Sequence, residues 1–564
     1  MEALDWLVIG VFFLALSGII VWVVRQKQND SADYFLGGRD ATWLAIGASI
    51  FASNIGSEHL IGLAGAGASS GMAMAHWEIQ GWMILILGWV FVPFYTRSMV
   101  YTMPEFLERR YNPQSRTILS VISLVSYVLT KVAVTVYAGG LVFQQVFGIK
   151  ELWGIDFFWI AAIGLVVLTA LYTIFGGMKS VLYTSVLQTP ILLLGSLIIL
   201  VLGFKELGGW DEMMRVCGAV TVNDYGDTMT NLIRSNDDAN FPWLGALIGS
   251  AIIGFWYWCT DQFIVQRVLS GKNEMEARRG TIFGAYLKLL PVFLFLIPGM
   301  IAFALHQKYI GAGGEGFLPM LENGTANADA AFPTLVAKLL PAGVKGLVVC
   351  GILAALMSSL ASLFNSSAML FTIDFYKRFR PQTSEKKLVG IGQVATVVIV
   401  ILGILWIPIM RSVGDVLYTY LQDVQSVLAP GIAAAFLLGI CWKRTSAQGG
   451  MWGLISGMVI GLTRLGAKVY YSNAGEVADS TFKYLFYDMN WLFFCGWMFL
   501  FCIIVVIVVS LATEAPTAEK IQGLVFGTAT KEQKASTRAS WNHWDIIHTV
   551  IILAITGAFY WYFW

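Results

Sequence analysis

Long apolar runs recur along the chain, and they restrict its fold more than any other feature of the sequence. Examples are Trp6–Val24, Val181–Leu202 and Trp491–Leu511. A helix needs about 20 apolar residues to cross the ~30 Å hydrocarbon core of a bilayer, and these runs reach that length. Only 13% of the 564 residues are charged, against about 25% in an ordinary soluble domain. The sequence therefore predicts an all-α multi-pass protein of a plasma or inner membrane, surrounded by the lipid bilayer.

Hydropathy and flanking charge predict about fourteen spans. They are centred near residues 15, 52, 88, 131, 165, 191, 255, 293, 355, 399, 427, 460, 500 and 554. Lys and Arg follow the odd-numbered spans, for example Arg25 after the first, Arg109 and Arg110 after the third, and Lys531 after the thirteenth. Because cytoplasmic loops carry an excess of these residues, both termini are expected outside.

Two spans carry polar interruptions at membrane depth. The stretch 47–71 reads GASIFASNIGSEHLIGLAGAGASSG, and 242–269 reads PWLGALIGSAIIGFWYWCTDQFIVQRVL. Such breaks are tolerated where the backbone is buried in protein or lines a watery cavity. The two lie five spans apart, which is the pattern of an inverted-repeat transporter with a site at the membrane midplane. The breaks are expected near Asn54 and near Tyr257.

The predicted organisation follows from this repeat. Residues 1–30 hold a first peripheral helix, 40–204 the first repeat (spans two to six), 205–240 an extracellular or periplasmic loop, 241–442 the second repeat (spans seven to eleven), and 443–564 the peripheral spans twelve to fourteen.

Several function classes have no support in the sequence. The net charge of +1 gives no basic face for nucleic acid. The chain has no GxxxxGK[ST] loop for ATP, and no HExxH, GxSxG or Cys/His metal cluster. We therefore expect neither an enzyme nor an ATP-driven pump.

Five ionisable residues fall inside predicted spans, where they indicate a functional site by default. They are His59, Glu78, Lys131, Asp261 and Lys288. Lys288 is expected in a polar cavity, with a structural ion pair as the alternative, and Glu78 either joins the site or extends to water at the start of its span. For Lys131 and Asp261 we favour structural pairing, while His59 stays open.

A run of small residues could bind a cation. Ala355, Ser358 and Ser359 lie at i, i+3 and i+4 on one helix face. Unwound carbonyls near Ala52 and Ile55 could complete an oxygen shell for sodium. The same pattern also serves close packing of helices, so spacing alone leaves both readings open.

The chain resembles the sodium/glucose cotransporters of the sodium–solute symporter family along nearly its whole length. The resemblance rests on DYFLGGRD, GASIFASNIGSEHLIGLAGAG, TMPEFLERRY, FWYWCTDQFIVQR, YLKLLP, AFPTLV, LMSSLASLFNSS and GICWKR. It implies a LeuT-type 5+5 inverted-repeat core and uptake of a hexose such as glucose or galactose, driven by inward sodium flow through alternating access. Sodium is then the coupling ion, and no other cofactor is implied.

The resemblance also implies site residues. The sugar pocket falls on Asn54, His59, Glu78, Tyr257, Trp258, Lys288 and Gln422, with Tyr257 similar to the family's inner-gate stacking residue. The sodium site falls on Ala52, Ile55, Ala355, Ser358 and Ser359, which favours ion binding over packing.

Three positions depart from many relatives. Ser185 stands where they carry Asp, so a second sodium site or a proton-linked role there is not expected. Glu58 and Gly254 are expected to change the hydrogen bonds around the sugar.

Rival hypotheses come from two classes. A symporter of the same family could carry another small solute, such as myo-inositol, a monocarboxylate, sialic acid or an amino acid. A sugar sensor or sugar-gated channel could use the same pocket without productive transport.

Overall fold

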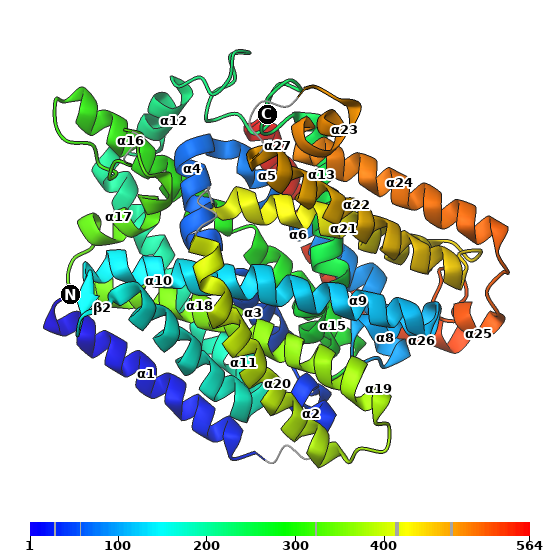
Figure 1. Ribbon diagram of the computed structural model, residues 1–564. Helices are drawn as coiled ribbons and strands as arrows, with labels where there is room; N and C mark the ends of the chain where they lie inside the picture. The colour runs from blue at the N-terminus through cyan, green and yellow to red at the C-terminus, as the bar shows by residue number, and fades with distance from the viewer. Residues whose placement is uncertain (27–29, 57, 322–323, 412–416, 474–477) are drawn as a thin grey trace.

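The structure is a computed structural model that describes residues 1–26, 30–56, 58–321, 324–411, 417–473 and 478–564. Its helical segments, with η for 3-10 and π-helical turns, are shown in Figure 1. The first part of the chain forms α1 (Ala3–Val24), α2 (Ser31–Leu36), η1 (Gly37–Arg39), α3 (Trp43–Asn54), η2 (Glu58–Leu63), α4 (Ala64–Ser70), η3 (Gly71–Met74), α5 (Ala75–Glu78), α6 (Gly81–Ile86), η4 (Leu87–Phe91), α7 (Val92–Ser98), α8 (Met103–Arg110), α9 (Pro113–Ser126), η5 (Tyr127–Val132) and α10 (Ala133–Phe147).

The middle of the chain holds a minimal hairpin and a second set of helices. These elements are β1 (Glu151–Leu152), β2 (Ile155–Asp156), α11 (Phe157–Leu207), α12 (Trp210–Gly218), α13 (Trp243–Gly254), η6 (Phe255–Thr260), α14 (Gln262–Leu269), α15 (Glu274–Lys288), η7 (Val292–Leu296), α16 (Ile297–Gly311), η8 (Ala328–Ala330) and α17 (Ala331–Leu339). The antiparallel pair of β1 and β2, with Glu151 opposite Asp156, is a small exception to the all-α expectation.

The last part of the chain is again helical. It forms α18 (Val344–Met369), η9 (Leu370–Tyr376), α19 (Lys377–Phe379), α20 (Glu385–Arg411), α21 (Leu417–Cys441), α22 (Ala447–Asn473), α23 (Thr481–Lys483), η10 (Tyr484–Asp488), α24 (Trp491–Ala512), α25 (Ala518–Ile521), α26 (Lys531–Ala539) and α27 (His543–Tyr562).

Both interrupted spans are broken helices. The α3 helix ends at Asn54, and Ile55 is extended, with φ −78° and ψ 107°. The α13–η6 segment ends at Thr260, and Asp261 is extended, with φ −78° and ψ 126°. Asp261 then caps α14, because its side chain accepts a hydrogen bond from the N–H of Phe263. The first break lies where the sequence predicts it, and the second lies a helical turn beyond Tyr257.

A third break divides the longest helix. The 51 residues of α11 contain the predicted fifth and sixth spans, and the helix is interrupted at Gly177, with φ 54° and ψ −149°. Only glycine adopts such a backbone without strain. A Cβ there would also lie 2.9 Å from the Cδ2 of Tyr34 on α2. The two spans are therefore separated at this glycine.

Peripheral helices lie on different flanks of the molecule. The first helix, α1, packs on α11 and α18, at the lower left of Figure 1. The α22 and α24 helices pack on each other and on α21, at the upper right. The last helix, α27, packs on α6 and α15.

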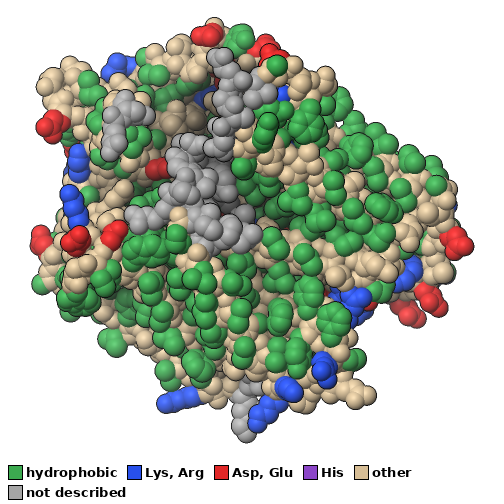
Figure 2. Space-filling view, viewed as in Figure 1, with side chains coloured by type: hydrophobic (Ala, Val, Ile, Leu, Met, Phe, Trp, Pro, Cys, Tyr) green, Lys and Arg blue, Asp and Glu red, His purple; other side chains and the backbone are tan. Residues whose placement is uncertain are grey.

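Within the described residues, ten helical segments are long and apolar enough to cross a membrane, and α3 and α10 are shorter apolar helices. The structure is thus that of a multi-pass membrane protein, while the count of fourteen spans stays a prediction. Figure 2 shows broad apolar surface over the middle of the molecule and Lys and Arg side chains along its lower edge.

Candidate functional site

A polar cavity lies between the two broken helices. The space between atoms there is about 400 Å³, a figure that includes open solvent. All the side chains predicted for a sugar pocket line it: Asn54, His59, Glu78, Tyr257, Trp258, Lys288 and Gln422. The structure therefore brings this predicted set together in one place.

The centre of the cavity is an ion pair between helix ends. Lys288 is the last residue of α15 and Glu78 the last of α5. The Nζ of Lys288 lies 2.6 Å from the Oε2 of Glu78 and 3.3 Å from the Oδ1 of Asn54. The Nε2 of His59 lies 3.3 Å from the same Glu78 oxygen. Lys288 thus lies in a polar cavity and also in an ion pair.

The burial of Glu78 distinguishes between the two alternatives left open for it, which are that it joins the site or that it extends to water. Its exposed fraction is 1% and that of Lys288 is 3%. The explanation that Glu78 extends to water is therefore wrong. A charge pair inside a protein needs further hydrogen bonds to offset its lost hydration, and Asn54 supplies one to Lys288.

Aromatic rings close one side of the cavity. The hydroxyl of Tyr257 accepts a hydrogen bond of 3.2 Å from the Nδ2 of Asn54. Its ring meets that of Trp258 edge-on, with centroids 4.9 Å apart. Both belong to η6, just before the break at Asp261. The broken helix therefore holds these rings against the end of α3.

Lys131 and Asp261 form the ion pair expected for them. The Nζ of Lys131 lies 2.7 Å from the Oδ2 of Asp261 and 4.6 Å from the centroid of the Tyr257 ring. The hydroxyl of Tyr127 donates to the other oxygen of Asp261. This pair fixes the second break against η5, behind the aromatic side of the cavity.

Two buried polar atoms of the cavity lining have no hydrogen-bond partner in the described part of the chain. They are the Nε1 of Trp77, which can only donate, and the Oε1 of Gln422, which can only accept. Unpaired buried polar atoms are costly. Their place on the cavity wall therefore indicates a polar ligand that pairs with them.

Gly254 makes room for the side chain of Gln80, which is not among the site residues predicted from the sequence. A Cβ at this position would lie 2.8 Å from the Cδ of Gln80. The Nε2 of Gln80 donates to the carbonyl oxygen of Ser250 at 2.7 Å. Gln80 thus occupies the space beside Gly254, which gives the departure at this position a physical reason.

The candidate sodium site is partly assembled. The Oγ of Ser359 donates to the carbonyl oxygens of Ser53 and Ile55, each at 3.0 Å. The Oγ of Ser358 lies 3.3 Å from that of Ser185. The α18 helix therefore contacts the end of α3 through Ser359 and α11 through Ser358. Ala52 and Ala355 are each 1% exposed, and their carbonyl oxygens complete the predicted set.

The donor types at this place fit sodium. Carbonyl and hydroxyl oxygens suit a hard cation, and unwound carbonyls beside a broken helix are the usual ligands for a coupling ion. Within the described residues, the structure holds no group of three or more His, Cys, Asp or Glu side chains that could bind a metal.

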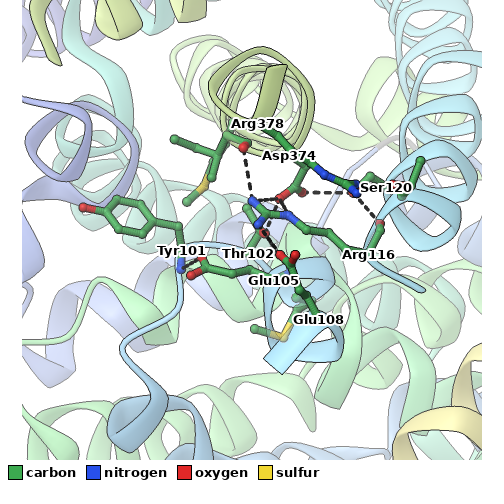
Figure 3. Close-up of polar contacts among 12 residues, drawn as sticks. Tyr101, Thr102, Glu105, Glu108, Arg116, Ser120, Asp374 and Arg378 are labelled. Carbon is green, nitrogen blue, oxygen red and sulfur yellow. Dashed lines mark hydrogen bonds and ion pairs between the residues drawn. The ribbon is translucent and has the colours of Figure 1, made fainter. Parts of the chain in front are cut away.

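A second polar cluster lies away from the cavity, where η9 meets α8 and α9 (Figure 3). The Oδ1 of Asp374 accepts hydrogen bonds of 2.8 Å from both Thr102 and the Nε of Arg116, and its Oδ2 accepts one of 3.1 Å from Ser120. Arg116 also reaches Glu108 at 2.6 Å. Asp374 is 2% exposed, so the cluster is a fully paired buried charge network.

Sequence reasoning missed part of the cavity lining. Trp77, Gln80, Ile253 and Gln425 line it in addition to Glu58 and Gly254. For three of these residues, their position in the sequence relative to a predicted site residue could have indicated them. Trp77 and Gln80 flank Glu78 in the chain, and Gln425 lies three residues beyond Gln422, on the same helix face.

Comparison of the sequence with a protein-family model shows to which family the chain belongs. The model of the sodium:solute symporter family matches residues 34–457. The chain belongs to this family. It is therefore a sodium-coupled symporter of a small solute in a membrane, as the motifs led us to expect.

Named relatives of this symporter agree with that assignment. It is 36% identical over 542 residues to the human sodium/myo-inositol cotransporter 2, covering 94% of this chain and 79% of the relative. It is 36% identical over 560 residues to the zebrafish (Danio rerio) sodium/glucose cotransporter 4, covering 96% of this chain and 84% of the relative. Both relatives are cotransporters rather than enzymes.

The fold of this symporter has a solved counterpart. A sodium-coupled sialic acid symporter, in a substrate-bound outward-open state, superposes with a TM-score of 0.72 at 21% identity. The match covers 92% of this symporter and 99% of that chain. The likeness establishes the fold, while the 5+5 repeat stays a prediction.

Proposed function

We propose that this symporter couples inward sodium flow to the uptake of a hexose such as glucose or galactose by alternating access. The observation that carries the proposal is the cavity wall itself. It combines carboxylate, ammonium, imidazole and amide groups with two polar atoms that have no hydrogen-bond partner among the described residues, Trp77 Nε1 and Gln422 Oε1. Such a wall suits a ligand with many hydroxyls, each able to donate and accept.

Aromatic rings support a ring-shaped solute. Trp77, Tyr257 and Trp258 line the same cavity as the charged groups. An aromatic side chain can cover the apolar face of a sugar ring while the polar groups bond its edge. Tyr257 is proposed as the inner-gate residue that stacks on the solute.

The charges of the cavity favour a neutral solute. Glu58 and Glu78 line it together with Lys288, and Lys288 is already paired with Glu78 at 2.6 Å. An anionic solute would meet an excess of negative charge, and like charges in a poorly solvated cavity repel strongly. Monocarboxylate and sialic acid are therefore weaker candidates than a neutral polyol.

A cyclic polyol such as myo-inositol is the second candidate. It offers hydroxyls on all sides of a six-membered ring, and polar groups line the cavity from α3, α5, α15 and α21. The resemblance to the human sodium/myo-inositol cotransporter 2 favours it too.

Sodium is proposed to bind Ala52, Ile55, Ala355, Ser358 and Ser359. The contact of Ser359 with Ile55 O supports this placement. Bound there, sodium would join the end of α3 to α18 and stabilise the outward-open arrangement, so that solute binds before both are released inward.

The orientation proposed for the chain has both termini outside. The carboxylate of Asp5 accepts hydrogen bonds from the N–H groups of Gly343 and Gly346, at the start of α18. The carbonyl oxygen of Phe563 accepts from the N–H of Leu232, in the loop assigned to the outside. Both ends of the chain therefore contact segments that the sequence assigns to the outside, which supports the proposed orientation.

The substrate can be tested by ligand-dependent stability. Purified protein is heated in sodium chloride or choline chloride with glucose, galactose, myo-inositol or sialic acid. We expect a rise in Tm with a neutral polyol that is larger in sodium, because a ligand that binds the folded state stabilises it. A rise with sialic acid alone would overturn the proposal. A sensor or channel would bind the same solute, but would pass current without accumulating it in liposomes.

A further inference from the structure

Glu58 lies where two cavities meet. It is the first residue of η2, immediately after the break that ends α3. It lines the proposed solute cavity and also an adjoining cavity, whose wall includes Ser359 and Thr135. The carboxylate is therefore positioned between the proposed solute site and the proposed sodium site.

The carboxylate of Glu58 and the hydroxyl of Ser359 converge on Gly56. A Cβ on Gly56 would lie 2.5 Å from the Oε2 of Glu58 and 2.9 Å from the Oγ of Ser359. The same Oγ lies 3.0 Å from the carbonyl oxygen of Ile55. Glycine at position 56 thus leaves the space in which a carboxylate reaches the edge of the sodium site.

The charge of Glu58 has no fixed counterpart in the described ranges. The neighbouring cations are taken, because Lys131 pairs with Asp261 at 2.7 Å and Lys288 with Glu78 at 2.6 Å. Within those ranges, Glu58 forms no ion pair with a lysine or arginine. Glu58 is only partly exposed, and a carboxylate partly withdrawn from water is less stable without a counter-charge.

On the side away from Glu58, the proposed sodium site meets a neutral group, the hydroxyl of Ser185. Ser358 contacts the hydroxyl of Ser185 at 3.3 Å, and Ser185 itself donates to the carbonyl oxygen of Val181. That side supplies oxygens without charge. A sodium ion would therefore find its nearest negative charge on the Glu58 side.

We propose that Glu58 is the residue that links the two sites: its carboxylate provides the counter-charge for sodium and accepts a hydrogen bond from the solute. This rests on the proposed function. Sodium fixes the position of the carboxylate, and the fixed carboxylate then binds a solute hydroxyl. Since coupling between two binding sites is reciprocal, bound solute strengthens sodium binding by the same factor.

Sodium binding without solute tests the first half of the proposal. Purified protein is titrated with sodium chloride against choline chloride at constant ionic strength, and tryptophan fluorescence reports binding. We expect E58Q to raise the half-saturating sodium concentration about tenfold, since a unit charge a few Å away contributes at least that much at moderate dielectric. The matched control is E315Q, on an exposed loop, which should not change it.

The second half is tested by measuring solute affinity with and without sodium. The ratio of the two affinities should be at least fivefold smaller in E58Q than in the wild type, while E58D should fall between them. A sodium affinity of E58Q within twofold of the wild type, or an unchanged ratio, would overturn the proposal. If E58Q does not fold, the same two measurements are made on E58D, whose shorter side chain withdraws the charge from Ser359. Values equal to those of the wild type would then overturn the proposal.

The outcome is separable from that of the proposed function. The sodium titration needs no solute, so a wild-type protein that binds sodium but no polyol refutes the proposed substrate and leaves the comparison of E58Q with the wild type intact.

Discussion

Lys288 and Glu78, from α15 and α5, pair at 2.6 Å in the centre of the solute cavity, although 210 positions separate them in the sequence. The pair holds two charges in place on the cavity wall, where both groups can meet a solute. A buried ion pair on its wall is the reason why we propose the cavity as a site for a polar ligand.

Removing one partner of this pair should weaken solute binding more than sodium binding. Lys288→Ala removes the cation that lies 2.6 Å from Glu78 and leaves His59, at 3.3 Å, beside the buried carboxylate. Removing one partner of a buried ion pair costs about 3–5 kcal/mol. We expect at least a tenfold loss of solute affinity. Glu78→Gln alone and the double variant complete the cycle, and the two single losses should not add, because the residues are in contact. Additive losses would show that they act separately.

Gln422→Ala should act on the solute in a different way. The variant removes an Oε1 that has no hydrogen-bond partner in the described part of the chain, and it leaves no buried charge. A hydrogen bond to a neutral group contributes about 0.5–1.5 kcal/mol, so a three- to tenfold loss of solute affinity is expected at unchanged protein Tm. Unchanged solute affinity would place Gln422 outside the site.

Ser359→Ala should impair sodium dependence. The hydroxyl contacts Ile55 O at 3.0 Å and is a proposed sodium ligand. We expect a higher half-saturating sodium concentration for uptake, with solute affinity at saturating sodium little changed. Ser362→Ala is the matched control, because its hydroxyl contacts the Ser53 hydroxyl and is not a proposed ligand. Equal effects of both variants would favour helix packing over ion binding.

Gly254→Ala should disturb the cavity through Gln80. The new methyl would push the side chain of Gln80 away and strain its 2.7 Å bond to Ser250 O. Solute affinity should fall severalfold. Gly18→Ala on α1, where a Cβ would meet nothing within 4 Å, should leave affinity and Tm unchanged. Wild-type affinity in Gly254→Ala would mean that Gln80 takes no part in solute binding.

Asp374→Ala should lower stability rather than ligand affinity. It removes the acceptor shared by Thr102, Arg116 and Ser120 and leaves Arg116 with Glu108 as its remaining ion-pair partner. Breaking a buried pair costs about 3–5 kcal/mol, and the expected readout is a clear drop in Tm. Thr102→Val removes the bond to Asp374 and the cap that the same hydroxyl gives the N–H of Glu105, and should cost about 2 kcal/mol. Equal losses would mean that the charge itself contributes little.

The local sequence was sufficient to predict that the two spans are broken helices. Polar residues in the middle of a long apolar run are tolerated in few other arrangements. The local sequence also predicted the pairing of Lys131 with Asp261, since two intramembrane charges of opposite sign need partners. The exact position of the second break could not be predicted from the local sequence. The run Phe255–Cys259 suits a helix or a turn equally well, and the cap that Asp261 gives α14 decides the matter.

Long-range contacts escaped prediction for a different reason. Asp374 and Thr102 are 272 residues apart, and no local pattern indicates that η9 meets α8. Gln80 likewise fills the space at Gly254 only because α13 lies against it. Such details depend on how the helices pack, which single-chain periodicity does not specify.

Accumulation of solute in proteoliposomes tests the central claim most directly. Liposomes holding the purified protein are loaded with potassium buffer and diluted into sodium or potassium buffer with labelled glucose, galactose or myo-inositol. The account predicts that the label rises above its external concentration only under an inward sodium gradient, and that it leaves again when a sodium ionophore dissipates the gradient. Equal uptake with and without the gradient would contradict sodium coupling.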